Sequence, residues 1–282
     1  MKVPYIMKQL SFIVFLILIC TFNLIALVYG AYAEEPKQIP TASTQNESEA
    51  YKYYQLGTEA LDIENYSKAI LYYSNSLDFD SFNSLVYYER ALAYEYIGEL
   101  DRAIFDLTSA IEIDNFFDDA YFNRGIVREK KGEFSKAIKD YTAAIDINPK
   151  DPWYFFKRAY VKRNFGDYKG AIEDYNQSIK LSPNLYNAYN NLSWLYSTCL
   201  DSKYRDGDKA LSLAQKSVEL KREGSTLDTL AAAHAELGNF DMAVKIQEEV
   251  LTFINKADEP DLYMSASTKL SHYKSKLPWR EQ

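Results

Sequence analysis

A repeat of 34 residues runs through this sequence from Ala50 to about Leu251 and constrains its fold more than any other feature. The unit from Ala120 to Pro149 shows it clearly, because a shift of 34 residues in either direction brings the same residue types back. Self-similarity at such a period is the signature of an array in which each unit packs against its neighbours. We therefore expect one elongated array rather than two domains of average size.

Columns of small and apolar residues predict two helices in each unit. The first helix carries one small column and the second helix carries an alanine column with a larger residue four positions later: Gly57, Ala91, Gly125, Ala159; Ala69, Ala103, Ala137, Ala171; Tyr73, Leu107, Tyr141, Tyr175. A spacing of four places two side chains on the same face of a helix, and small residues suit a close helix crossing.

Glycine and proline positions predict where these helices end. Gly98, Gly132 and Gly166 lie between the two helices of a unit, where glycine can adopt the left-handed conformation that ends a helix. Each second helix is expected to close near Asn115, Pro149 or Pro183. The whole chain has only 10 Gly and 8 Pro, which favours helices over a turn-rich β fold.

The period and its small–aromatic–small columns resemble the tetratricopeptide repeat. Four units fit without a gap, whereas the fifth, from Tyr186, places its alanine at Ala210, five residues late, after a polar loop over residues 200–207. A sixth unit follows through Leu227, Ala231, Gly238, Phe240 and Ala243. The resemblance implies an all-α fold, a right-handed α-α superhelix (solenoid) of about six helix pairs.

One more helix is expected after the array. Pro260 suits the first turn of a helix, and five apolar residues after it fall on one face: Leu262, Ala266, Leu270, Tyr273, Leu277. Such a helix would cover the last apolar surface of an open-ended stack. We therefore expect residues 50–254 to form the repeat array and residues 255–282 to form a capping helix and tail.

The first 33 residues have the three parts of a secretory signal. Lys2 and Lys8 precede an apolar run from Leu10 to Val28, and small residues follow at 31 and 33. Because this run is also long enough to span a bilayer, a cleaved signal peptide and a retained membrane anchor remain alternatives. In both cases the body crosses the membrane, so we expect an extracytoplasmic protein of the bacterial-envelope type. Residues 34–49 are polar and predict a flexible linker.

Charge, cysteine and histidine content argue against several classes of function. A net charge of −8 disfavours binding to nucleic acid. Without Cys20 of the apolar run, Cys199 is the one cysteine left, so we expect no intramolecular disulfide and a small core residue rather than a reactive thiol. His234 and His272 lack metal-ligand spacing, and His234 among alanines suits an interior or groove-edge residue. We expect no enzyme, no cofactor and no metal.

The resemblance implies a concave groove lined by the first helices, which in tetratricopeptide folds takes an extended peptide or a partner helix. Two columns would face it, the second made of Thr58, Leu92, Ile126, Tyr160 and Trp194. In the family this second column is commonly polar, and here it is mostly large and apolar, which suits a binding surface. Alternatively, these side chains merely pack against neighbouring helices.

With the first column and the adjacent polar residues, the predicted binding residues are Tyr54, Tyr88, Leu92, Phe122, Asn123, Ile126, Phe156, Lys157, Tyr160, Asn190, Asn191 and Trp194. Co-chaperones of the family grip a C-terminal carboxylate with a set of Lys, Asn and Arg residues. Only Asn123 and Lys157 match that set, so this activity is not carried over.

The favoured hypothesis is a non-catalytic protein–protein interaction scaffold that binds a peptide or partner helix of another envelope protein in the groove. Such a scaffold would bind no nucleic acid and would contact the membrane only through an uncleaved N-terminal segment. The alternative is an envelope protein that binds a glycan or small ligand in the aromatic groove. A hydrolytic function would rest on His234 alone.

Overall fold

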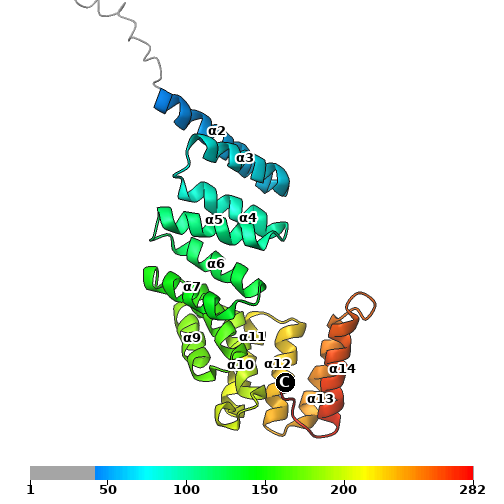
Figure 1. Ribbon diagram of the computed structural model, residues 1–282. Helices are drawn as coiled ribbons and strands as arrows, with labels where there is room; N and C mark the ends of the chain where they lie inside the picture. Colours follow the sequence, from blue (N-terminus) through cyan, green and yellow to red (C-terminus); the bar gives the residue numbers. More distant parts are fainter. Residues whose placement is uncertain (1–41, 282) are drawn as a thin grey trace, which may run out of the picture. The chain divides into compact units, whose positions relative to one another are not determined.

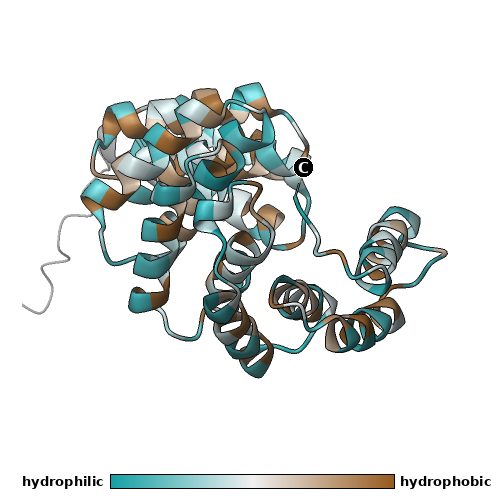
Figure 2. Ribbon diagram, turned by 90° about the horizontal axis from the view of Figure 1, so that it is seen from below, coloured by the Kyte–Doolittle hydropathy of each residue, from teal (hydrophilic) through white to brown (hydrophobic). Residues whose placement is uncertain are grey.

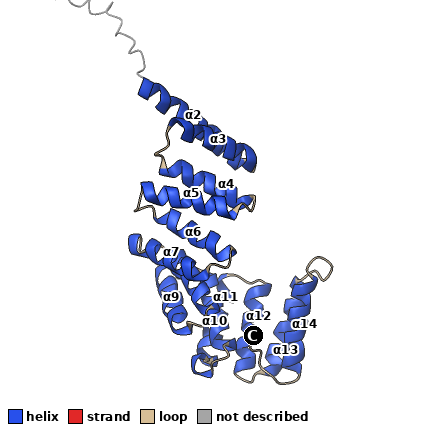
Figure 3. Ribbon diagram, viewed as in Figure 1, coloured by secondary structure: helices blue, strands red, loops and turns tan. Residues whose placement is uncertain are grey.

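The computed structural model describes residues 42–281, and this part of the chain is built from helices (Figures 1 and 3). The described residues form thirteen α-helices and one short 3-10 helix, with no strand among them. The helices are α2 (Ala42–Asp62), α3 (Tyr66–Phe79), α4 (Ser84–Tyr96), α5 (Leu100–Ile113), α6 (Asp118–Lys130), α7 (Phe134–Ile147), α8 (Pro152–Asn164), α9 (Tyr168–Leu181), α10 (Tyr186–Thr198), η1 (Ser202–Tyr204), α11 (Gly207–Leu220), α12 (Gly224–Glu236), α13 (Phe240–Phe253) and α14 (Pro260–Lys274).

The expected signal or anchor over residues 1–33 lies outside the described residues. The chain divides after Glu49, and residues 42–49, expected within the flexible linker, are helical. Alanine, glutamine and glutamate in this stretch favour helix formation. Within residues 42–281, no helix is both long and apolar enough to cross a membrane.

Successive helices pair as the repeat predicts. The pairs α4–α5, α6–α7, α8–α9, α10–α11 and α12–α13 have the closest packing, and each pair packs on the next to give a tetratricopeptide-like solenoid. Its helices carry both hydrophobic and hydrophilic residues along their length (Figure 2), as expected for elements with one buried side. The second helices end at Ile113, Ile147 and Leu181, close to the predicted ends.

The small columns lie where the paired helices cross. The column from Ala69 to Ala171 is completely buried, and so are Tyr73, Leu107, Tyr141 and Tyr175. A Cβ atom added to Gly125 would lie 2.6 Å from the ring of Tyr141, so this crossing requires glycine. The turn glycines Gly98 and Gly132 have φ values of 80° and 75°, which confirms the predicted left-handed helix ends.

Three buried Arg–Asp pairs, which the sequence pattern did not predict, join neighbouring helices in the stretch from α3 to α9. Arg124 donates to Asp140 of its own unit at 2.8 Å and to Thr108 of the preceding unit at 3.1 Å. Arg90 and Arg158 make the corresponding contacts with Asp106 and Ser74, and with Asp174 and Thr142. Each arginine therefore joins its own helix pair to the pair before it by charge-assisted hydrogen bonds.

The C-terminal repeats are joined differently. The inserted loop forms η1, where Tyr204 packs against Tyr168 at a ring distance of 5.4 Å. The chain after α14 returns to α10, since the Glu281 amide donates to the Thr198 carbonyl at 3.1 Å. Arg280 forms a 2.7 Å ion pair with Glu236 at the end of α12. Cys199 is buried in the core between α9 and α10, as predicted.

The face that α14 buries differs from the predicted one. Ala266 and Tyr273 are buried, as expected, but Leu262 and Leu277 are 52% and 55% exposed. Lys269 lies on the inner side instead and is only 9% exposed. Leu277 follows the end of the helix at Lys274, and Leu262 lies beside a pocket instead of in the core.

Candidate functional site

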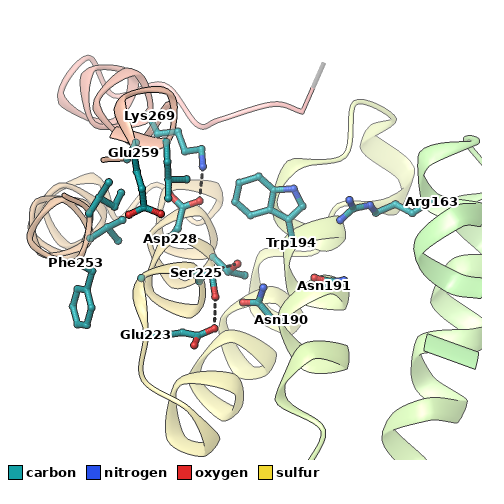
Figure 4. A pocket seen from close by; sticks show the side chains of 16 residues that line it. Arg163, Asn190, Asn191, Trp194, Glu223, Ser225, Asp228, Phe253, Glu259 and Lys269 are labelled. Atoms are coloured by element: carbon teal, nitrogen blue, oxygen red, sulfur yellow. Dashed lines mark hydrogen bonds and ion pairs between the residues drawn. The ribbon is translucent and has the colours of Figure 1, made fainter. Parts of the chain in front are cut away.

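The side chains of the last repeats surround a pocket of about 570 Å³ (Figure 4). One wall comes from α10 through Asn190, Asn191 and Trp194, and Arg163 of α8 lies beside it. The other walls come from α12, α13, the segment before α14, and α14 itself, and their residues include Glu223, Ser225, Asp228, Thr229, Val250, Phe253, Ile254, Glu259, Leu262, Ala266 and Lys269. Three of the predicted binding residues therefore line one pocket together.

The repeat register explains why the pocket opens here. Tyr88, Phe122 and Phe156 are each the fifth residue of their helix, and the same position holds Asn190 in α10 and Asp228 in α12. An aromatic ring at the fifth position fills the space between helices, whereas the short side chains of Asn190 and Asp228 leave it open. Asp228 was not among the predicted residues, because the first column was followed only to Asn190. Allowing for the residues inserted after α10 would have placed Asp228 as the next member of this column.

Trp194 and Asp228 are held by a network that reaches α14. The Lys269 ammonium donates to Asp228 and lies 4.9 Å from the centroid of the Trp194 ring. Gln247 of α13, which is completely buried, donates to the other oxygen of Asp228 at 2.8 Å. These contacts fix the indole and the carboxylate in position, and a cation over an indole face adds attraction. The sequence pattern predicted α14 only as a cap, and Lys269 was not among the predicted binding residues.

Other charged residues of the pocket are also held by neighbours. Arg163 lies 5.4 Å from the Tyr160 ring centroid and 3.6 Å from a carboxylate oxygen of Glu281. Glu223 pairs with Lys221 at 2.8 Å, and the hydrogen bond from Lys221 lowers the pKa of that carboxyl. The side-chain oxygen of Asn190 is buried and accepts no hydrogen bond from any described residue.

The remaining predicted binding residues lie along the earlier repeats and outside this pocket. Phe156 is only 9% exposed and belongs to the core, so it offers almost no surface to a ligand. Phe122 packs between Tyr141 and Tyr154, with ring centroids 5.6 and 4.7 Å away. Ile126 and Tyr160 are partly buried against the cluster that contains Ala137.

Polar members of the predicted set make contacts between neighbouring first helices. Asn123 donates to the Tyr88 hydroxyl at 3.0 Å, and Lys157 lies 3.5 Å from Glu129. Burial raises the pKa of the Tyr88 hydroxyl. Tyr54 and Leu92 are half-buried. In this part of the chain the two columns form a packed, partly exposed surface rather than a cavity.

His234 lies in a second cavity with Asp241 and Lys276 among its lining residues. Its Nδ1 atom is buried without a hydrogen-bond partner among the described residues, and burial lowers its pKa. A general base needs an orienting partner and a nucleophile within hydrogen-bond distance. The described contacts of His234 supply neither. No group of three or more potential metal ligands occurs among residues 42–281.

The stacked helix pairs define a helical-repeat solenoid, and the pocket lies among its last repeats. Models of the tetratricopeptide repeat match residues 85–117, 118–151 and 154–185. The chain therefore contains tetratricopeptide repeats, as the sequence predicted. The pocket of Figure 4 lies mostly in the repeats that follow these matches. A search of curated proteins found no match.

Several solved structures are similar to this chain. MamA is 24% identical, with a TM-score of 0.54 over 59% of this chain and 94% of MamA. YrrB, described as a TPR protein with an unusual peptide-binding site, is 19% identical, with a TM-score of 0.56 over 70% of this chain and 96% of YrrB. The Cut9–Hcn1 complex contains a chain 18% identical, with a TM-score of 0.59 over 82% of this chain and 48% of that one. At these identities the similarity shows the fold alone.

Proposed function

We propose that this protein is a non-catalytic scaffold that binds a peptide or helix of a protein partner in the groove of its last repeats. The pocket around Trp194 is the observation that carries the proposal. It combines an indole, exposed apolar side chains and a buried, unpartnered amide oxygen, and such a combination suits a peptide with both apolar and hydrogen-bonding groups. The peptide-binding site named for the similar YrrB fits this function.

The protein works outside the cytoplasm in this proposal, as an envelope protein secreted or tethered by its N-terminal segment. The charge pattern of residues 1–33 supports this location, because the lysines precede the apolar run. Contact with the membrane would involve only that segment, if it is retained. Fractionation of the native host, with detection of the full chain by an antibody, tests the location; recovery in the cytoplasmic fraction alone would exclude it.

A pulldown from envelope extract tests the groove with the full chain as bait. Trp194→Ala removes the indole at the centre of the pocket, and we expect it to lose the captured partner. Trp153→Ala is the matched control, because Trp153 is 43% exposed and does not line the pocket. Tyr160→Ala, one repeat before Trp194, tests whether the binding surface extends along the column. If the Trp194 and Tyr160 variants both keep every partner at full strength, the groove does not bind the partner.

Binding of a small ligand is the second candidate, because the volume of about 570 Å³ lies within the range of small-molecule sites. Stacking of a sugar on Trp194 is less favoured, since the Lys269 ammonium already lies over that ring. Retention of the protein on a polysaccharide column, and loss of that retention in Trp194→Ala, would favour the glycan form of this candidate.

A further inference from the structure

The charges that line the pocket are balanced except at one residue. Arg163 faces Glu281, Glu223 faces Lys221, and Asp228 faces Lys269. Glu259, in the segment before α14, has no ion-pair partner among the described residues. Figure 4 shows its carboxylate on the pocket side, with Arg163 on the opposite side of Trp194. The unbalanced charge of the pocket is therefore negative and lies at its α14 end.

The one buried lining atom without a partner is also an acceptor. The side-chain oxygen of Asn190 has no donor among the described residues, although most buried polar atoms in proteins have one. A bound ligand that supplies an N–H group would remove this deficit, because a buried acceptor without a hydrogen bond is unfavourable. Glu259 and Asn190 together therefore select a ligand rich in hydrogen-bond donors and positive charge.

Apolar side chains lie on the α13 and α14 side of the pocket, where Glu259 also lies. Phe253 and Leu262 are 49% and 52% exposed, and Val250, Ile254 and Ala266 lie beside them. Burial of an apolar side chain of the ligand here removes surface from water on both partners. An apolar group and a cationic group of one ligand can thus be bound within a single pocket.

Resting on the proposed peptide-binding function, we infer that the ligand is a peptide segment with an apolar residue next to a lysine or arginine. The apolar side chain packs on Phe253 and Leu262, the cation pairs with Glu259, and a backbone N–H donates to Asn190. Arg163 disfavours the reverse orientation, because it would place like charges together. This chemistry is opposite to the capture of a carboxylate, which needs an excess of positive groups.

Selection from a random heptapeptide library displayed on phage, with the full chain as target, tests this inference. We expect selected peptides to be enriched in Lys or Arg adjacent to an aliphatic or aromatic residue. Binding of one selected peptide should weaken about three- to fivefold in Glu259→Gln, because Glu259 is exposed and its ion pair forms at the rim. Asp261→Asn is the matched control, since it removes one negative charge nearby from a residue that does not line the pocket. We expect it to leave the affinity unchanged.

The outcomes separate this inference from the function on which it rests. Peptides that bind wild type, lose affinity in Trp194→Ala, and show no preference for basic residues would keep the proposed function and overturn the ligand chemistry. Equal affinity of a basic peptide for wild type and Glu259→Gln would overturn it too. If no peptide distinguishes wild type from Trp194→Ala, the proposed peptide-binding function fails as well.

Discussion

The repeats from α4 to α9 and those from α10 to α14 share one architecture but differ at two positions of each first helix. The seventh residue is Arg90, Arg124 or Arg158 in the first set, whereas it is Leu192 in α10 and Leu230 in α12. The fifth residue is aromatic in the first set and becomes Asn190 and Asp228 in the second, as described above. The first region thus has an aromatic ring at the fifth position of each first helix, and buried Arg–Asp pairs join its repeats. The second region has a pocket beside that position.

This difference shows how a repeat array can place the contacts that stabilise it in one region and an open pocket in another. In the first region, the buried aspartates receive two or more charge-assisted hydrogen bonds, and each arginine also donates to the unit before its own. In the second region, the Lys269–Asp228 pair joins α14 to α12, and the chain after α14 adds ties through Arg280 and Glu281. The walls of the pocket are therefore held both by the contacts of Asp228 and by the tail, and Asn190 keeps a buried side-chain oxygen without a partner among the described residues.

Asp140→Ala should produce the largest loss of stability and should confine it to the first region. The change leaves Arg124 and Arg128 without the carboxylate that each contacts at 2.8 and 2.7 Å, and a buried unpaired charge costs about 3–5 kcal/mol. Hydrogen exchange measures where the loss occurs, because repeat arrays open locally. We expect faster exchange in α6–α8 and little change in α12–α14.

Asp146→Ala on the same helix is the control for this variant, since Asp146 is exposed and should change stability by no more than about 0.5 kcal/mol. A similar loss in both variants would show that the buried pairs do not hold the first region together. Equal acceleration of exchange in α12–α14 would remove the distinction between the two regions.

Ala137→Leu tests the close helix crossing in the first region, and we expect a loss of about 1–3 kcal/mol from overpacking. Ala137 is completely buried where α6 and α7 meet, whereas Ala143 of the same helix is only partly buried. Ala143→Leu is therefore the matched control. Thermal unfolding measures both variants, and an unchanged melting temperature for Ala137→Leu would contradict the buried crossing.

The sequence predicted the helix pairs and their turns because each rests on local rules. The close helix crossing requires a small residue at Ala137 and at Gly125, and the left-handed turn requires glycine at Gly132. All three recur with the period of 34 residues. The buried Arg–Asp pairs join residues 16 positions apart across two helices, so no helical spacing within one element reveals them. Trp194 was predicted because the second column departs from the family pattern, Asn190 because it continues the first column, and Asn191 because it is a polar residue next to them. Lys269 and Glu259 were not found, since they follow the last repeat and reach the pocket only through the return of α14.

Arg280→Ala tests whether the chain after α14 ties the second region together, and we expect a loss of about 1 kcal/mol. Arg280 pairs with Glu236 at 2.7 Å and donates to the Ser197 carbonyl at 3.2 Å, so it joins α12 to α10. Lys274→Ala, which breaks an exposed pair with Glu248, is the control and should change stability less. Urea denaturation compares the two variants. If Lys274→Ala lowers the midpoint as much as Arg280→Ala, the tail makes no special contribution.

The smallest expected effect is a dependence of stability on histidine protonation. It is confined to the second region, because His234 and His272 both lie there. Burial lowers the pKa of His234, so the folded protein holds this proton less tightly than the unfolded chain does. The stability of the folded protein is therefore fully present above the ordinary histidine pKa of about 6.5 and decreases as the pH falls below it.

His234→Gln should lose less stability than wild type between pH 7.5 and 5.5, by about 1 kcal/mol or less for a partly buried site. Urea midpoints at both pH values measure this difference, with His272→Gln as the control. If His234→Gln loses as much stability as wild type between these pH values, the dependence comes from carboxylates, which both regions contain.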